Sequence, residues 1–311
     1  MLTSFAAPQG GVSALRAAGR ALMTVIELIE RASARLDQAG VSFGQGTTNA
    51  FDEAAWLVLW RLGLPLDALE DVADQPIDDS RAAVVDTLIT QRIETRKPTA
   101  YLTGEAWLQG VPFTVDERAI VPRSLIAEVL NDGTLDAWLQ APPARVLDLC
   151  TGTGSLAVLA ALRWPIAAVD ATDISTDALH LAQANVERHD LADRISLHHA
   201  DGFGPLRDRY DLILCNPPYV DTLSMDALPP EFRAEPALAL AGGDDGMEFI
   251  RPLLQQAAGH LLPQGMLVLE IGHEREHFDA AFPSLDVVGL PTSEGDDAVL
   301  LITRDALEKA P

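Results

Sequence analysis

The chain has 311 residues, of which 48% are hydrophobic, so it can build one large domain or two smaller ones around a proper core. Its 46 acidic residues outnumber its 22 basic residues, and the formal charge of −24 argues against a surface that binds nucleic-acid phosphates by itself. This charge suits a basic protein as a partner, although a generally acidic surface would give the same balance.

Cysteine and histidine usage predicts neither a disulfide nor a metal site. Cys150 and Cys215 both follow apolar runs, which fits a reducing compartment, and we expect the cytoplasm. His198 and His199 have no partners at metal-ligand spacing and are interpreted as a pair at a sheet edge. The sequence has no run of 18 or more apolar residues, so no membrane span is predicted.

Residues 1–22 are rich in Ala and Gly and carry Arg16 and Arg20 without any acid. We expect a disordered tail or a start placed upstream of the true one, and a transit peptide remains conceivable. Residues 23–96 then contain three stretches whose apolar residues recur at a period of about 3.6, which predicts a small helical bundle. Nothing in this bundle indicates catalysis.

Residues 97–122 are predicted to connect the bundle to a second domain. Val111, Phe113 and Val115 alternate with polar or turn residues, which indicates one strand of a short hairpin. Arg123 follows at the start of the second domain, residues 123–311. It is either a plain surface charge at a helix start or a residue near the functional site.

The second domain alternates strands with helices, which is typical of an α/β fold. Val146-Leu147-Asp148-Leu149 is a buried-type strand, and the glycine loop Cys150-Thr151-Gly152-Thr153-Gly154-Ser155 leads from it into a helix. Glycines let the backbone approach a ligand and present N–H groups at a helix start. Ala157 stands where a dinucleotide fingerprint has its third glycine, a permitted variant, so the loop alone leaves a nicotinamide enzyme open.

Acidic residues follow the next two strands. Asp173 lies roughly twenty residues after the glycine loop, where a carboxylate accepts the hydroxyl groups of a ribose. It could instead cap the next helix, but Ser175 and Thr176 are also able to do so. Asp201 and Phe203 are placed to meet an adenine ring, or else are an ordinary turn acid and a core aromatic.

The apolar run Leu212-Ile213-Leu214 ends in Cys215-Asn216-Pro217-Pro218-Tyr219. Two successive prolines remove two backbone donors and fix two φ angles, so the strand must stop there. The result is a stiff elbow that holds an amide and a phenol at the carboxyl end of a strand, where open α/β sheets bind ligands. A turn with a buried tyrosine would require neither the asparagine nor the second proline. The polar segment 221–245 that follows is long enough to be functional.

The order of glycine loop, acid and elbow resembles the class I methyltransferases. The resemblance implies an α/β fold with a seven-stranded sheet whose last strand is antiparallel, and S-adenosyl-L-methionine as the cofactor. Nearly the whole chain is similar to the protein glutamine methyltransferases of translation factors and ribosomal proteins. The motifs that carry this similarity are residues 98–104, 121–123, 148–154 and 216–219.

The resemblance also implies roles for individual residues. Asn216, Pro217 and Tyr219 are the implied catalytic residues: the Asn216 Oδ1 and the Pro217 carbonyl accept the two N–H groups of the substrate amide, beside which Tyr219 packs. Pro218 and Arg123 complete the implied substrate site. The implied cofactor-binding residues are Asp148, Cys150, Thr151, Gly152, Thr153, Gly154, Asp173, Asp201, Phe203 and Asn216.

Within this family two branches differ, and the chain has Cys150 and Gly202 where the release-factor branch has glycine and tryptophan. Gly44-Gln45-Gly46-Thr47 and Glu231-Phe232-Arg233-Ala234-Glu235-Pro236 look like the branch that methylates large-subunit ribosomal protein L three. The expected partner is therefore this basic protein, with no stable nucleic-acid binding and with the helical bundle as a recognition domain. Release factors, an adenine of a nucleic acid and a non-catalytic role in ribosome assembly are the alternatives.

Overall fold

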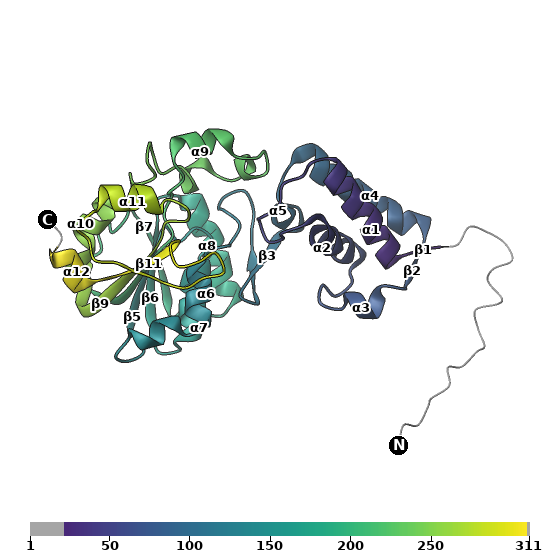
Figure 1. The fold of residues 1–311 in the computed structure, drawn as a ribbon. Coiled ribbons are helices and arrows are strands. Elements are labelled where there is room, and N and C mark those ends of the chain that lie inside the picture. Colours follow the sequence, from purple (N-terminus) through teal and green to yellow (C-terminus); the bar gives the residue numbers. More distant parts are fainter. Residues whose placement is uncertain (1–21, 310–311) are drawn as a thin grey trace, which may run out of the picture. The chain divides into compact units, whose positions relative to one another are not determined.

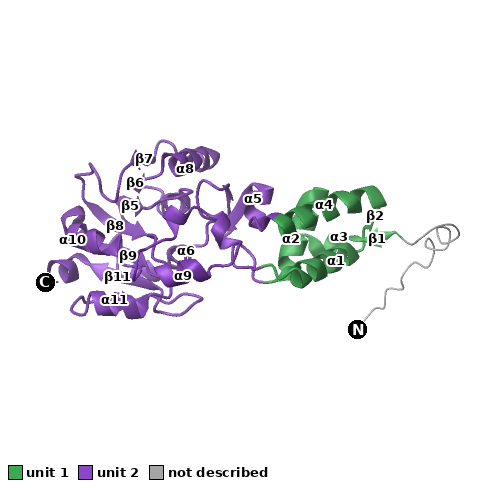
Figure 2. Cartoon of the chain, turned by 90° about the horizontal axis from the view of Figure 1, so that it is seen from above, with its two compact units in different colours: residues 1–41, 49–94 green, residues 42–48, 95–311 purple. Residues whose placement is uncertain are grey.

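The computed structural model describes residues 22–309, so the expected tail falls outside the described residues except for Leu22. The chain forms two compact units, shown in different colours in Figure 2. Of the described residues, the first unit contains 22–41 and 49–94, and the second contains 42–48 and 95–309. Among the described residues, no helix is both long and apolar enough to cross a membrane.

The first unit is a helical bundle. Its elements are β1 (Met23–Thr24), α1 (Val25–Gln38), α2 (Ala50–Leu62), α3 (Leu69–Val72), β2 (Pro76–Ile77) and α4 (Asp79–Thr95). A capping box of Thr24 and Glu27 starts α1, because each side chain accepts from the other's backbone N–H. Between the helices lies a buried ion pair, in which Arg92 Nε donates to Glu53 Oε1 at 2.7 Å.

The second unit begins with α5 (Thr99–Thr103) and the hairpin of β3 (Glu105–Leu108) and β4 (Val111–Thr114). The hairpin is part of this unit, because the buried amide of Asn185 binds it. Asn185 Oδ1 accepts from the Thr114 N–H at 2.7 Å, and its Nδ2 donates to the carbonyl groups of Thr114 and Thr153 at 3.0 and 2.9 Å. One side chain thus joins the hairpin to the glycine loop.

A seven-stranded sheet within the described residues forms the centre of the second unit (Figure 1). The strands are β5 (Arg145–Leu149), β6 (Ala168–Asp173), β7 (Ile195–His199), β8 (Tyr210–Cys215), β9 (Leu261–Glu270), β10 (Val288–Gly289) and β11 (Val299–Thr303). Their order is β10-β11-β9-β8-β5-β6-β7, and β11 runs antiparallel to both of its neighbours. The predicted sheet with its antiparallel last strand is confirmed.

Helices cover both faces of the sheet, because the buried strands are apolar on both sides. One face carries α6 (Ile126–Asn131), α7 (Ser155–Arg163) and α8 (Thr176–Arg188). The other carries α10 (Ile250–His260), α11 (Arg275–Ala281) and α12 (Arg304–Lys309), which share one core with Leu147, Ile213 and Leu267 of the sheet. The short helix α9 (Thr222–Ala227) and the 3₁₀ turns η2 (Phe232–Ala234) and η3 (Ala237–Ala239) lie in the long segment after β8, and η1 (Thr134–Ala137) follows α6.

Candidate active site

The site lies at the carboxyl ends of the central strands. Cys215 is level with Leu149 of β5 and Leu269 of β9, so the next residues of these strands, Cys150, Asn216 and Glu270, share one edge of the sheet. A cavity lies there, with about 840 Å³ of empty space when the open solvent at its mouth is included. Of the predicted site residues, Cys150, Gly152, Asp173, Asp201, Asn216 and Pro218 line it.

The glycine loop owes its shape to residues beneath the cavity. Asp148 Oδ2 accepts from Thr151 Oγ1 at 2.5 Å and from the Ala157 N–H at 3.1 Å, while its Oδ1 has no hydrogen-bond partner among the described residues. Burial raises the pKa of Asp148 to about 7. Thr151 and Thr153 are buried and are not among the residues that line the cavity, so they shape the loop rather than its surface.

Gly154 permits close packing of two helices at the end of this loop. Its φ is +78°, and a Cβ atom there would lie 3.1 Å from the Cβ of Ala182 in α8. A glycine at this position therefore lets α7 start directly against α8. Like Thr153, Gly154 does not line the cavity.

Asp173 is held at the cavity by backbone groups. Its Oδ2 accepts from the Gly152 N–H at 2.9 Å and its Oδ1 from the Ser175 N–H at 2.8 Å. Burial raises the pKa of Asp173, while these N–H groups oppose the rise. The cap of α8 is Ser175, whose hydroxyl accepts from the Ala178 N–H at 3.2 Å, so Asp173 is not used as that cap.

Phe203 does not line the cavity. It is 2% exposed, belongs to the core beneath the sheet and stacks on the His260 ring with centroids 4.1 Å apart. The structure thus supports the interpretation of Phe203 as a core aromatic. The aromatic ring on the cavity wall is Phe249, whose Cζ would be 4.0 Å from a Cβ at Gly202. No sequence signal marked Phe249, because it is simply one apolar residue before a helix.

The elbow presents the Asn216 side chain to the cavity. This amide makes no hydrogen bond to another described residue, so its donor and acceptor groups remain available to a ligand. Pro217 is buried and Pro218 lines the cavity. Backbone contacts fix the elbow from behind, since a Cβ on Gly246 would lie 2.3 Å from the Tyr219 carbonyl oxygen.

Tyr219 is held by Glu270 at the end of β9 and by Gly272 just after it. A Cβ on Gly272 would lie 2.6 Å from Cε2 of the Tyr219 ring, so only glycine allows this contact. The Tyr219 hydroxyl donates to Glu270 Oε1 at 3.3 Å, and burial raises the pKa of Tyr219. Sequence reasoning missed Glu270, although its place at the end of a buried strand next to the elbow is a usable signal.

Arg123 contacts the segment after the elbow. Its two terminal nitrogens donate to the Glu235 carboxylate at 2.6 and 2.8 Å, and its guanidinium lies over the Phe232 ring at 5.4 Å from the centroid. Neither Arg123 nor Glu235 lines the cavity. Arg123 therefore supports the site from outside the cavity wall. Its binding of the substrate stays a prediction.

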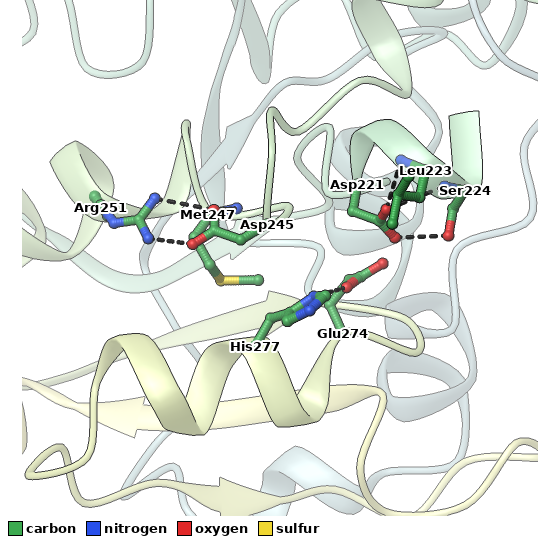
Figure 3. A network of polar contacts seen from close by, with 8 residues as sticks. All are labelled: Asp221, Leu223, Ser224, Asp245, Met247, Arg251, Glu274 and His277. Carbon is green, nitrogen blue, oxygen red and sulfur yellow. Dashed lines mark hydrogen bonds and ion pairs between the residues drawn. The ribbon is translucent and has the colours of Figure 1, made fainter. Parts of the chain in front are cut away.

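Both ends of the long segment 221–249 are fixed by carboxylates (Figure 3). Asp221 caps α9 through the N–H groups of Leu223 and Ser224 at 2.8 and 3.0 Å, and the Ser224 hydroxyl lowers the pKa of Asp221. Asp245 pairs with Arg251 at the other end. His277 contacts Glu274 at 2.6 Å beside Asp221 in the figure, and this carboxylate raises the pKa of His277.

A glycine loop after the first strand, an acid after the second and an amide elbow after the fourth, on a sheet with this strand order, define a class I methyltransferase. The family model described as Methyltransferase small domain matches residues 132–234. A solved methyltransferase from Pyrococcus furiosus is 20% identical with a TM-score of 0.46, covering 63% of this chain and 89% of that chain.

Curated relatives place the chain more narrowly. It is 52% identical to the ribosomal protein uL3 glutamine methyltransferase of Bordetella pertussis, over 92% of this chain and 97% of the relative. It is 48% identical to the protein of the same name from Burkholderia pseudomallei, over 91% of this chain and 95% of the relative. The chain belongs to the family of ribosomal protein uL3 glutamine methyltransferases.

Proposed function

We propose that this protein transfers a methyl group from S-adenosyl-L-methionine to the side-chain amide nitrogen of a glutamine in ribosomal protein uL3. The observation that carries the proposal is the Asn216 amide, which lines the cavity at the end of β8 within a backbone held rigid by two prolines. The names of the relatives support the same substrate.

The cavity fits the cofactor in its charge and in its apolar walls. The cofactor is a cation that supplies an electrophilic methyl group on sulfur when bound, and Asp173 and Asp201 place two carboxyl groups on the cavity wall, while Asp148, whose pKa burial raises to about 7, lies beneath the glycine loop. Asp173 would accept the ribose hydroxyls, since it stands at the cavity wall and is not used as the cap of α8. Asp201 would meet the adenine amino group, and Phe249 and Ile174 would hold the ring between them.

The reaction requires positioning more than acid–base chemistry. An amide nitrogen is a poor nucleophile because its lone pair is shared with the carbonyl group. Asn216 Oδ1 and the Pro217 carbonyl accept the two N–H bonds of the substrate glutamine, which directs the lone pair and stabilises the positive charge that grows on nitrogen. As the nitrogen gains the methyl group its protons become acidic, and it releases one of them, so that the product is a neutral N-methyl amide. Tyr219 keeps the planar amide in place from the side, and its ring is itself held by Gly272 and Glu270.

The test is transfer of labelled methyl from S-adenosyl-L-methionine to purified ribosomal protein uL3 and, in parallel, to a peptide chain release factor and to a nucleic acid. We expect labelling of uL3 alone, on a glutamine located by mass spectrometry. Because the chain carries a net charge of −24 and the substrate is basic, the rate should fall as salt is added. Labelling of the release factor without labelling of uL3 would contradict the assignment of the substrate.

A further inference from the structure

Two segments that are far apart in the sequence contact each other in the second unit. They are the turn at residues 42–48 and the segment at residues 231–236. Gln45 is 6% exposed, and its Nε2 donates to the main-chain oxygen of Glu231 at 3.4 Å. A Cβ on Gly44, whose φ is +119°, would lie 3.4 Å from Cζ of Phe232. The turn therefore rests on the backbone and on the aromatic ring of the second segment.

Two arginines hold the same segment. Arg123 binds both oxygens of Glu235, and the same carboxylate accepts from the Val121 N–H at 2.9 Å. Arg96 Nη1 donates to Glu231 Oε1 at 3.1 Å. Glu231 is 0% exposed and Glu235 is 4% exposed, and buried ion pairs add little net stability compared with apolar residues. Their effect here is to hold a segment without long helices or strands in one conformation.

The conformation of this segment sets the shape of the cavity. Pro236, which ends the segment, lines the cavity together with Leu238 and Ala239. Leu238 is 59% exposed, so this wall also faces the solvent from which a protein substrate arrives. A shift of residues 231–236 would move the wall without changing Asp173 or Asn216, which belong to other elements.

Resting on the function proposed above, we propose that residues 42–48 and 231–236 form one recognition unit that selects the protein substrate. It acts by positioning the wall at Pro236, Leu238 and Ala239, along which the polypeptide carrying the glutamine lies. Gln45 and Phe232 are then specificity-determining residues that affect binding of the substrate protein and leave the methyl-transfer step itself unchanged.

The experiment compares Gln45→Ala and Phe232→Leu with the parent in steady-state methylation of uL3. We expect kcat/KM to fall about tenfold or more, through a higher KM at nearly unchanged kcat. Binding of S-adenosylhomocysteine, measured by calorimetry, should stay within about twofold of the parent, because Asp173 and Asp201, which are assigned to the cofactor, belong to other segments than this part of the cavity wall. Since the two residues act as one unit, the kcat/KM of the double variant should be only slightly lower than that of the more impaired single variant.

Arg233→Gln is the matched control, because Arg233 lies in the same segment but is exposed and donates only outward, to the Asp226 carbonyl. It should behave as the parent. Unchanged kcat/KM in both Gln45→Ala and Phe232→Leu, or equal losses in cofactor binding, would overturn the recognition unit. If the parent methylates another protein instead of uL3, the proposed substrate is wrong. The recognition unit is then tested by comparing the KM of Gln45→Ala and Phe232→Leu with that of the parent on that other protein.

Discussion

The hydroxyl group of Tyr219 donates to Oε1 of Glu270 at 3.3 Å, which links the Asn-Pro-Pro-Tyr elbow after β8 to the end of the neighbouring strand β9. The other oxygen of the same carboxylate accepts from Ser124 Oγ at 2.5 Å and from the Leu125 N–H at 3.0 Å. One buried carboxylate thus holds the phenol of the elbow and the chain that leads into α6.

We expect Glu270→Gln to lower kcat by roughly tenfold, because the amide cannot accept all of these donors and the Tyr219 ring becomes less well positioned. Tyr219→Phe should have a milder effect, since Gly272 still holds its ring. If Glu270 acts through Tyr219, adding Tyr219→Phe to Glu270→Gln should cost little further. Additive losses in kcat would show instead that the two residues act independently.

Asn216→Ala should abolish most methyl transfer while S-adenosylhomocysteine binds with near-parental affinity. In the proposed mechanism the asparagine supplies the oxygen that orients the substrate amide, and removing one such group typically costs about a hundredfold or more in kcat. Single-turnover methylation of uL3 and calorimetry are the two measurements. Turnover at the parental rate would refute the assigned role of the elbow.

Asp173→Ala should weaken cofactor binding by about tenfold or more, because each lost bond to a charged group is worth roughly 1.5–3 kcal/mol. Calorimetry with S-adenosylhomocysteine measures this, and thermal melting checks the fold, since Asp173 also accepts from two backbone N–H groups. Asp177→Ala, in the first turn of α8, is the control and should bind normally. Equal affinities for the parent and Asp173→Ala would rule out the ribose contact.

Asp148 should make the free protein less stable as the pH rises towards 7. Its pKa is raised from 3.8 to about 7 by burial, so between these values the folded state keeps a proton that the unfolded chain has released. The free energy of unfolding therefore falls with rising pH in this window, by up to about 1.4 kcal/mol per pH unit, and levels off above it.

Asp148→Asn lacks this titration. Urea unfolding of both proteins at about pH 5, 6, 7 and 8 should show the parent losing stability relative to the variant as the pH rises to 7. The comparison isolates Asp148 from Glu270, whose pKa burial also raises to about 7. A constant difference across this range would contradict the raised pKa.

In the first unit, Glu53→Gln should destabilise the bundle by about 3–5 kcal/mol. The change removes the charge that faces Arg92 Nε, and the Arg92 side chain is only 1% exposed, so the buried cation loses charge compensation. The double variant Glu53→Met, Arg92→Met should recover most of the loss, because it buries no charge. Urea unfolding followed by tryptophan fluorescence, to which Trp56 and Trp60 on α2 contribute, provides the measurement.

Local patterns in the sequence determined the glycine loop and the elbow of the candidate site. Adjacent residues are sufficient to predict both, because Pro217 and Pro218 must end a strand and the glycines after Leu149 must form a tight loop. The parallel order of the sheet then brings Cys150, Asp173 and Asn216 to one edge. The alternation of strands and helices indicated the α/β class, whereas the seven-stranded sheet with its antiparallel last strand was implied by the resemblance to the class I methyltransferases.

Only the tertiary structure decided which side chains meet across the chain. Phe203 and Phe249 are both apolar residues near a strand or helix end, and their packing alone puts the first in the core and the second on the cavity wall. The contact of Gln45 with Glu231 spans 186 residues, and the bond of Ser124 to Glu270 spans 146. Such contacts depend on how distant elements pack, so no local period or motif in the sequence encodes them.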